Sequence, residues 1–230
     1  MVANSNGYHP VREYLNHLDW DRTPRVRFAL HHFLGAEICD LNEELLRLFM
    51  LGAVTRIFQP GYKFDMMLCL TGGQGAGKSS FFRFLAGNDE WFSDDLRKLD
   101  DENVYRRIMG HWIIEMSEMM ATGNAKNVEE IKSFLSRQKD TYKVPYDKFP
   151  ADRPRQCVFA GTSNKLDFLP HDRSGNRRFL PIRIDPDKAE VHILANQQTS
   201  RAYFNQLWAE IMVIYRSGEY SLQLSKEASK

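Results

Sequence analysis

The stretch GGQGAGKSS, residues 72–80, constrains the fold of this chain more than any other part of its sequence. It matches the pattern G-x-x-x-x-G-K-[ST], whose glycines allow backbone N–H groups to turn toward phosphate oxygens. The apolar run DMMLCL at 65–70 precedes it and predicts a buried strand, while KSSFFRFLA at 78–86 predicts a helix. A strand, a glycine-rich loop and a helix N-terminus in this order form a phosphate-binding site.

The motif predicts a binding site for ATP and Mg²⁺. Lys78 is expected to reach the β and γ phosphates, and the hydroxyl of Ser79 is expected to coordinate the metal. The residues expected to surround the nucleotide are consecutive: Gly72, Gly73, Gln74, Gly75, Ala76, Gly77, Lys78, Ser79 and Ser80. The alternative is a glycine-rich surface loop that binds no ligand.

The segment HWIIEMSEM at 111–119 supplies acidic groups for the metal and for the attacking water. Its apolar residues predict a strand with Glu115 at the carboxyl end, where ligands bind in open parallel sheets. We expect Glu115 to hold Mg²⁺ together with Ser79, and Glu118 to orient or deprotonate the water. The pattern leaves open that these two roles are exchanged, or that one glutamate is a solvated loop residue.

The segment QCVFAGTSN at 156–164 predicts a further strand that ends in polar residues. A polar side chain at such a strand tip can reach both the γ-phosphate and the lytic water. Asn164 is therefore the predicted sensor of the nucleotide. The alternative is an asparagine that only forms a turn.

The remaining pattern predicts an α/β protein of the P-loop NTPase type. Residues 1–62 predict an N-terminal helical region, and residues 63–186 alternate strands with helices, which favours a parallel sheet with crossover helices. Residues 187–230 form a C-terminal tail with an amphipathic helix that ends at Gly218. The last strand contains Pro181, which favours an edge position because proline cannot donate to a neighbouring strand.

Composition narrows the classes of function. No apolar run approaches the roughly 20 residues of a membrane span, so no membrane contact is expected. The three cysteines, Cys39, Cys69 and Cys157, form no zinc pattern and no expected disulfide, which suits a reducing compartment. Because the net charge is only +1, contact with nucleic acid requires a local basic patch.

Residues 136–156, SRQKDTYKVPYDKFPADRPRQ, contain six lysines or arginines and three aspartates. Aromatic side chains are interleaved with lysines there, which suits a strand hairpin that binds the DNA backbone and stacks on bases. The predicted DNA-binding residues are Lys139, Tyr142, Lys143, Tyr146 and Lys148. Composition equally allows a solvated charged loop whose aromatic side chains pack inward.

In this order, these stretches resemble the virulence-associated protein E family of phages and mobile islands, which is similar to the superfamily-three helicases of the AAA+-like ATPases. The resemblance covers nearly the whole chain, in HPVREYLNHLDWD, QPGYKFD, TGGQGAGKSSFFRFLAG, WFSDDL, GHWIIEMSEM, IKSFLSRQKDTYKVPYD, PRQCVFAGTSN and SGNRRFLPIRI. It implies a five-stranded core. The phosphate loop would follow the first strand, the acidic motif would lie on the third and the sensor on the fourth, and two arginines would precede the fifth.

The resemblance also implies a role for the arginines in SGNRRFLPIRI, residues 174–184. In ring ATPases of this type, the arginine before the last core strand enters the neighbouring subunit and meets the γ-phosphate bound there. Arg178 is therefore the expected arginine finger, Arg177 is the second choice or an assistant, and Arg173 is a weaker candidate. The alternative is a salt bridge within the chain.

The implied function is an Mg²⁺-dependent ATPase motor on DNA, a helicase in the replication of a phage or mobile element in the bacterial cytoplasm. The resemblance implies a homo-oligomeric ring, such as a hexamer, with single-stranded or forked DNA and a primase or other replication protein as partners. Two alternatives stay open. One is a DNA-independent P-loop kinase, and the other is a nucleotide-switched assembly or packaging factor.

Overall fold

The computed structural model describes residues 9–96, 99, 104–117, 125–143, 148–164 and 176–225. The first strand is preceded by α1 (Pro10–Asn16), α2 (Val26–Leu34) and α3 (Asp40–Phe58). The core continues with β1 (Met67–Thr71), α4 (Lys78–Leu85), η1 (Asp89–Trp91), β2 (Phe92–Ser93), α5 (Val104–Ile108), β3 (Ile113–Ser117) and α6 (Ala125–Leu135). It ends with β4 (Lys139–Tyr142), β5 (Ala151–Pro154), β6 (Val158–Ser163), η3 (Asn176–Arg178), β7 (Phe179–Arg183), η4 (Pro186–Lys188) and α7 (Gln197–Ser217).

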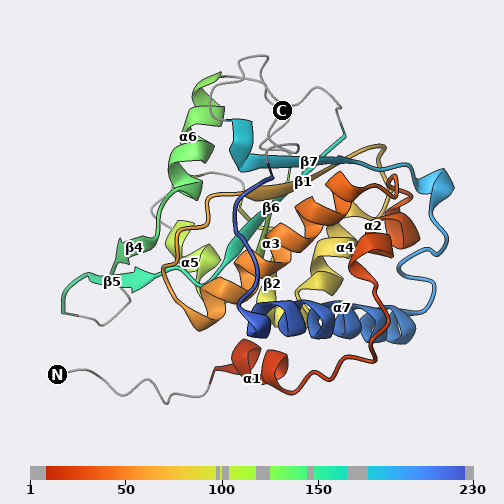
Figure 1. Cartoon of the computed structure of the whole chain (residues 1–230). Helices are drawn as coiled ribbons and strands as arrows, with labels where there is room; N and C mark the ends of the chain where they lie inside the picture. Colours follow the sequence, from red (N-terminus) through yellow and green to blue (C-terminus); the bar gives the residue numbers. More distant parts are fainter. Residues whose placement is uncertain are drawn as a thin grey trace.

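Five of these strands form one parallel sheet in the order β2-β3-β6-β1-β7 (Figure 1). This confirms the predicted α/β class with a five-stranded parallel sheet. Along the chain, β3 is the third strand of the sheet and β6 the fourth, as expected for the acidic and sensor strands. The last strand, β7, lies at the edge, and its Pro181 is exposed.

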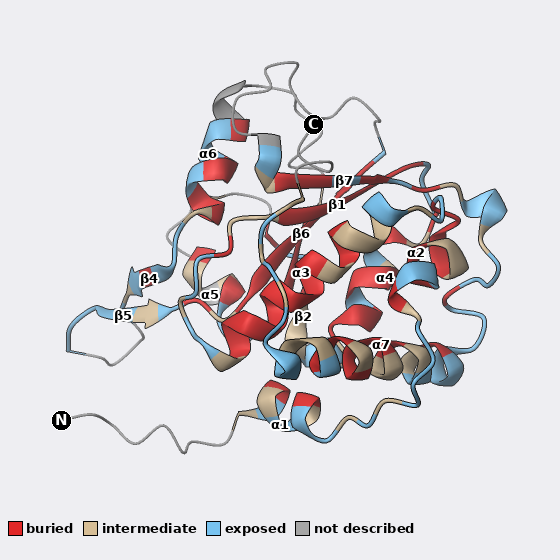
Figure 2. Ribbon diagram, in the orientation of Figure 1, coloured by how far each residue is buried: buried red, intermediate tan, exposed pale blue. Residues whose placement is uncertain are grey.

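Side chains of the central strands alternate between two hydrophobic cores, one on each face of the sheet. On one face, Leu68 and Leu70 of β1 pack with apolar residues of α1, α2, α3, α4 and α7. On the other face, Met67 and Cys69 pack with residues of α5 and α6. A strand covered on both faces must be apolar throughout, and Figure 2 shows β1 as continuously buried. The described helices therefore form a layer on each side of the sheet.

Aromatic packing sets the position of α4. Phe81 and Phe82 are fully buried, and their rings contact Phe204 of α7 at 5.2 Å and Phe49 of α3 at 6.3 Å between centroids. The helix is thus held between the sheet and its neighbours, with its first residue, Lys78, next to the loop that follows β1. Orphan N–H groups of its first turn face that loop, as an anion site requires.

The segment between α6 and β6 contains a separate antiparallel pair, β4 and β5, at one side of the molecule (Figure 1). Lys139 lies opposite Pro154 and Tyr142 opposite Ala151. The hairpin expected in this basic segment is therefore present. Across the described residues, no helix has the length and apolar character that crossing a bilayer requires.

Candidate functional site

Glycine is required at several positions of the loop between β1 and α4. A Cβ added to Gly72 would lie 2.6 Å from Cγ1 of Ile184, so the backbone approaches the end of β7 closely. Gly75 and Gly77 have φ angles of 79° and 76°, which residues with side chains rarely adopt. Gly77 is also the N-cap of α4, so the loop leads directly into the first turn of that helix.

The ammonium group of Lys78 is held inside this loop. Its Nζ donates hydrogen bonds to the carbonyl oxygens of Gly72 at 2.9 Å and Gly73 at 2.6 Å, and to Oδ1 of Asn164 at 3.0 Å. Lys78 is only 8% exposed, and burial lowers the pKa of its ammonium, against the opposing influence of the Glu115 carboxylate. The fold therefore brings the motif lysine and the predicted sensor into direct contact.

Glu115 lies within β3 rather than at its carboxyl end, because the strand continues to Ser117. This corrects the strand boundary predicted from the sequence. The Oε1 atom of Glu115 accepts hydrogen bonds from Oγ of Ser79 at 2.7 Å and Oγ1 of Thr162 at 2.6 Å. Burial raises the pKa of the Glu115 carboxyl group, and the hydrogen bonds from Thr162 and Ser79 oppose that rise.

The other carboxylate oxygen of Glu115, Oε2, is buried and has no hydrogen-bond partner among the described residues. Carboxylate and hydroxyl oxygens are the ligands that Mg²⁺ prefers. Together with the hydroxyl of Ser79, this orphan oxygen is a donor pair that fits the predicted metal. No larger cluster of histidine, cysteine, aspartate or glutamate exists in the part of the chain that the structure describes.

A cavity of about 660 Å³ is lined by Lys78, Ser79 and Asn164, while Glu115 is buried behind it and is not part of the lining. Residues 74–80 of the loop and α4 line one part of it, and Ser117 and residues 162–164, at the ends of β3 and β6, line another. The lining also includes His192 and Leu194, which follow β7. Its volume suits a ligand of nucleotide size.

The fold thus assembles most of the predicted nucleotide site from separate segments of the chain. Sequence reasoning did not assign Thr162, although its polar side chain at the tip of the sensor strand was a visible signal. It also missed His192 and Leu194, which belong to no motif. Glu118, the predicted base for the attacking water, lies outside the described residues.

The expected arginine finger has partners within its own chain. The Nε atom of Arg178 lies 3.1 Å from Oδ2 of Asp65 and donates a hydrogen bond to Oγ of Ser136 at 3.2 Å. This is the intrachain salt bridge that the sequence left open as the alternative. Arg177, in the same short turn η3, is exposed and has no ion pair among the described residues. Arg173 lies outside those residues.

Two of the predicted DNA-binding residues, Lys139 and Tyr142, lie on β4 and contact other residues of the chain. Lys139 forms an ion pair with Asp152 on the opposite strand. Tyr142 stacks on Tyr105 of α5, with ring centroids 5.6 Å apart and an interplanar angle of 3°, and the guanidinium of Arg153 lies 5.2 Å from its ring centroid. These contacts match the alternative in which the aromatic side chains of this segment pack inward.

The region around the hairpin turn is more exposed. Lys143 and Lys148 are both exposed, and Nζ of Lys148 lies 5.8 Å from the ring centroid of Phe149. Phe149 is 70% exposed, the largest value among the exposed large hydrophobic residues described. Tyr146 lies outside the described residues. Cationic and aromatic groups in solvent are suited to contact with a nucleic-acid backbone and its bases.

A buried ion pair holds the base of the hairpin. Arg155 donates from Nε and Nη2 to the two carboxylate oxygens of Asp140, both at 2.7 Å, and from Nη1 to the carbonyl of Phe134 at 2.6 Å. Arg155 and Asp140 are 3% and 4% exposed. Because Asp140 belongs to β4 and Phe134 to α6, the pair fixes the hairpin against the core.

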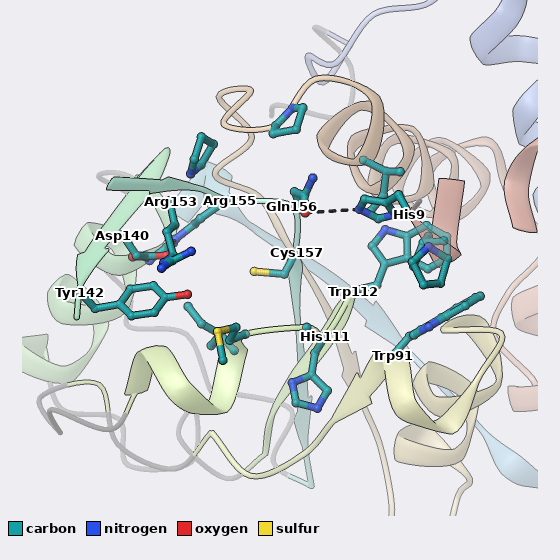
Figure 3. A pocket seen from close by; sticks show the side chains of 18 of the residues that line it. His9, Trp91, His111, Trp112, Asp140, Tyr142, Arg153, Arg155, Gln156 and Cys157 are labelled. Atoms are coloured by element: carbon teal, nitrogen blue, oxygen red, sulfur yellow. Dashed lines mark hydrogen bonds and ion pairs between the residues drawn. The ribbon is translucent and has the colours of Figure 1, made fainter. Parts of the chain in front are cut away.

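A second cavity, of about 610 Å³, lies at the base of the hairpin (Figure 3). Its lining includes His111 and Trp112 just before β3, and Gln156 just before β6. The Oε1 atom of Gln156 accepts a 3.3 Å hydrogen bond from Nε2 of His9. Burial lowers the pKa of the His111 imidazole. This cavity is at the amino ends of β3 and β6, whereas the phosphate loop is at the carboxyl end of β1. Tyr142 is the predicted site residue that lines it.

Known proteins resemble this chain in sequence pattern and in fold. The model of the virulence-associated protein E-like domain matches residues 15–230. The apo A form of the NrS-1 C-terminal region aligns with a TM-score of 0.62 and 15% identity, over 86% of this chain and 48% of that one. A second apo A-form structure, of the NrS-1 C-terminal region 305–718, aligns with a TM-score of 0.53 and 16% identity, over 86% and 46%.

The chain therefore spans about half the length of the solved structures that it matches. At this level of identity, the likeness shows a shared fold. No curated protein matches the chain.

Proposed function

The chain belongs to the virulence-associated protein E-like family, and from this premise we propose that it is an Mg²⁺-dependent ATPase motor acting on DNA. The proposed activity is that of a ring helicase in the replication of a phage or mobile genetic element. The proposed partners are single-stranded or forked DNA, further copies of the chain, and a primase or other replication protein.

One observation carries the ATPase proposal: two hydrogen-bonded pairs, Lys78 with Asn164 and Ser79 with Glu115, lie next to a nucleotide-sized cavity. Lys78 donates to loop carbonyl oxygens in this structure. Phosphate oxygens carry more negative charge than carbonyl oxygens and accept stronger hydrogen bonds from an ammonium group. A triphosphate can therefore replace those carbonyls as the partner of Lys78.

The pair Ser79 and Glu115 supports the proposal of Mg²⁺. The hydroxyl of Ser79 and the orphan Oε2 of Glu115 would hold the ion, which when bound neutralises charge on the phosphates. The contribution of the chain is to hold the carboxyl group beside Ser79 through two hydrogen bonds. Hydrogen bonds from Thr162 and Ser79 favour its ionised form, against the effect of burial.

We assign the remaining chemistry of hydrolysis to residues at the strand ends. Asn164 is proposed to orient the γ-phosphate or the attacking water through its amide, since it already contacts Lys78. Glu118 is proposed as the general base. Hydrolysis then needs a group that stabilises the charge developing on the transferred phosphoryl, a role that arginine fingers fill in other ATPases.

We propose that Arg177 and Arg178 of η3 both contribute to hydrolysis, in different roles. The ion pair with Asp65 supports a role for Arg178 in positioning the turn before β7. The exposure of Arg177 supports its reach into a neighbouring subunit. The assignment of Arg178 as the finger, which the sequence resemblance implies, stays a prediction. Variants of the two residues separate the assignments.

The rate of ATP hydrolysis, measured with and without single-stranded DNA, tests the proposal. An ATPase motor on DNA hydrolyses ATP faster when DNA is present, and Lys78→Ala abolishes both rates. Hydrolysis that ignores DNA would favour a DNA-independent P-loop enzyme. Binding of ATP without hydrolysis in either condition would favour a nucleotide-switched assembly or packaging factor.

A further inference from the structure

Two side chains in the 660 Å³ cavity belong neither to the phosphate loop nor to the strand ends. They are His192 and Leu194, in the segment between β7 and α7. Leu194 is 47% exposed, so its side chain presents an apolar surface to the cavity. The other lining residues are glycine, alanine, serine, threonine, lysine, glutamine and asparagine. The cavity therefore has one polar part and one part with a large apolar surface.

We infer that His192 and Leu194 form the platform for the nucleobase of the nucleotide whose phosphates occupy residues 72–80, and that this platform favours purines. The inference rests on the proposed ATP-binding function and names the group that this end of the cavity recognises. A base has a planar, largely apolar face, so it gains most from contact with an aliphatic side chain and a flat imidazole ring. A purine covers more of such a surface than a pyrimidine does.

The platform is held in place by a buried anchor between its two members. Ile193 is 1% exposed, and a Cβ added to Gly77 would lie 3.6 Å from its Cγ2. Ile193 therefore packs directly beneath the last glycine of the phosphate loop. Its carbonyl also accepts a 2.8 Å hydrogen bond from Oγ of the buried Ser200. Any ligand that lies along the loop must pass next to the residues that flank Ile193.

A hydrogen-bonded turn orients the two flanking side chains. The N–H of Ala195 donates to the carbonyl of His192 at 2.8 Å, and the N–H of Leu194 donates to Nδ1 of His192 at 3.3 Å. In the neutral imidazole this leaves Nε2 as the nitrogen that carries the proton. The hydrogen bond to Nδ1 also fixes the orientation of the imidazole ring, so that its flat face can pack against a base.

Residues 185–191, which precede the turn, contact α2 and Gly35, the residue that follows α2. The N–H of Val191 donates to the carbonyl of His32 at 3.0 Å, and Nδ1 of His32 lies 2.6 Å from the carboxylate of Glu190. A Cβ on Gly35 would lie 1.9 Å from the carbonyl oxygen of Asp185, so the two backbones are in direct contact. The platform is thus a preformed surface, which reduces the ordering that nucleotide binding requires.

Calorimetric titration with three ligands tests the inference: ATP, UTP and inorganic tripolyphosphate, each with Mg²⁺. Tripolyphosphate has the phosphates but no base. Leu194→Ala is expected to weaken ATP binding about tenfold, the loss of one base contact, and to leave tripolyphosphate binding unchanged. His192→Ala is expected to act in the same direction, and the preference for ATP over UTP is expected to fall in both variants. Leu194→Met, which keeps the apolar surface, is expected to retain ATP binding.

The matched control is Val191→Ala, because Val191 is an exposed aliphatic residue of the same segment that does not line the cavity. It should bind all three ligands as the unmodified chain does. The inference is overturned if Leu194→Ala and His192→Ala bind ATP normally while Lys78→Ala does not, and the proposed function then survives. If the unmodified chain binds neither ATP nor tripolyphosphate, the proposed function fails, and the platform fails with it.

Discussion

The Nζ atom of Lys78 lies 3.0 Å from Oδ1 of Asn164, a residue 86 positions later in the chain. The contact exists because β6, which ends just before Asn164, pairs directly with β1, which leads into the loop of Lys78. The same ammonium closes the loop on itself through two carbonyl oxygens. Lys78 therefore joins the loop to Asn164, directly after the sensor strand.

Lys78→Ala is expected to abolish ATP hydrolysis and to weaken ATP binding, because the backbone amides of the loop cannot by themselves match the charge of a triphosphate. The matched control is Lys63→Ala, which removes an exposed lysine just before β1. Hydrolysis rate and ATP affinity of the purified variants are the measurements. Near-normal hydrolysis in Lys78→Ala would remove the loop from the mechanism.

Glu115→Gln is expected to raise the Mg²⁺ concentration needed for hydrolysis by about tenfold or more, because it removes a carboxylate ligand of the ion. Glu118→Gln is expected to bind ATP and Mg²⁺ normally and to turn over slowly. The measurement is the hydrolysis rate of both variants across a Mg²⁺ titration. The reverse pattern would mean that the two glutamates exchange roles.

The pH dependence of Glu115 follows from its raised pKa. Metal binding needs the ionised carboxylate. Because the pKa of Glu115 is raised, Mg²⁺-dependent activity should fall in acid at a higher pH than it would if Glu115 were exposed. For stability the sign is opposite: the folded chain binds this proton more tightly than the unfolded chain, so its stabilising effect is lost as pH rises. Without Mg²⁺, Glu115→Gln should therefore melt above the unmodified chain at alkaline pH, and the difference should vanish in acid.

Lys143→Ala and Lys148→Ala are each expected to weaken DNA binding at low salt while ATP hydrolysis without DNA stays unchanged. Each lost phosphate contact should lower the slope of log affinity against log salt by about one unit. Lys139→Ala is the matched control, since its ammonium is already paired with Asp152 and should contribute less. A fluorescence-anisotropy series measures the slopes. Slopes for Lys143→Ala and Lys148→Ala equal to that of the unmodified chain would argue against the hairpin turn as a DNA contact.

Asp140→Ala is expected to destabilise the fold by about 3–5 kcal/mol, because it leaves the buried guanidinium of Arg155 without its charged partner. Asp152→Ala, on the next strand of the same hairpin, removes an exposed partner of Lys139 and Thr141 and should change stability little. Chemical denaturation of both variants provides the comparison. Equal losses would show that the buried pair has no special part in anchoring the hairpin.

An arginine that acts in trans should lower hydrolysis by about 10³–10⁵-fold when replaced by alanine, while nucleotide binding stays normal. Arg178→Ala and Arg177→Ala are therefore each mixed with Lys78→Ala, whose own arginines are intact. Light scattering first confirms that each mixture assembles. Activity should then partly return in the mixture that contains the variant lacking the finger. If neither mixture recovers, the trans finger is wrong, and a loss of stability shared by Arg178→Ala and Asp65→Ala would identify the intrachain ion pair as the role of Arg178.

Some elements were predictable because their causes are local in sequence. Gly75 and Gly77 must be glycine for the positive φ angles of the loop. Residues 67–70 form an unbroken apolar run, the pattern of a strand covered on both faces. Other elements have no local cause. β2 has only two residues, too few for any periodic pattern, and is a strand because Phe92 pairs with Ile113. Likewise β3 extends to Ser117 because its partner β6 continues beside it to Thr162.

The sequence by itself determined the phosphate loop, the alternation of strands and helices, and the polar residues at the strand tips, since each depends on neighbours within a few positions. Only the tertiary structure decided which tips meet. Because β6 lies between β3 and β1, Thr162 reaches Glu115 and Asn164 reaches Lys78. The same holds for the ion pair of Arg178 with Asp65 and for the position of His192 beside the phosphate loop. Strand order and side-chain packing join residues far apart in the chain, and no periodicity in the sequence encodes those distances.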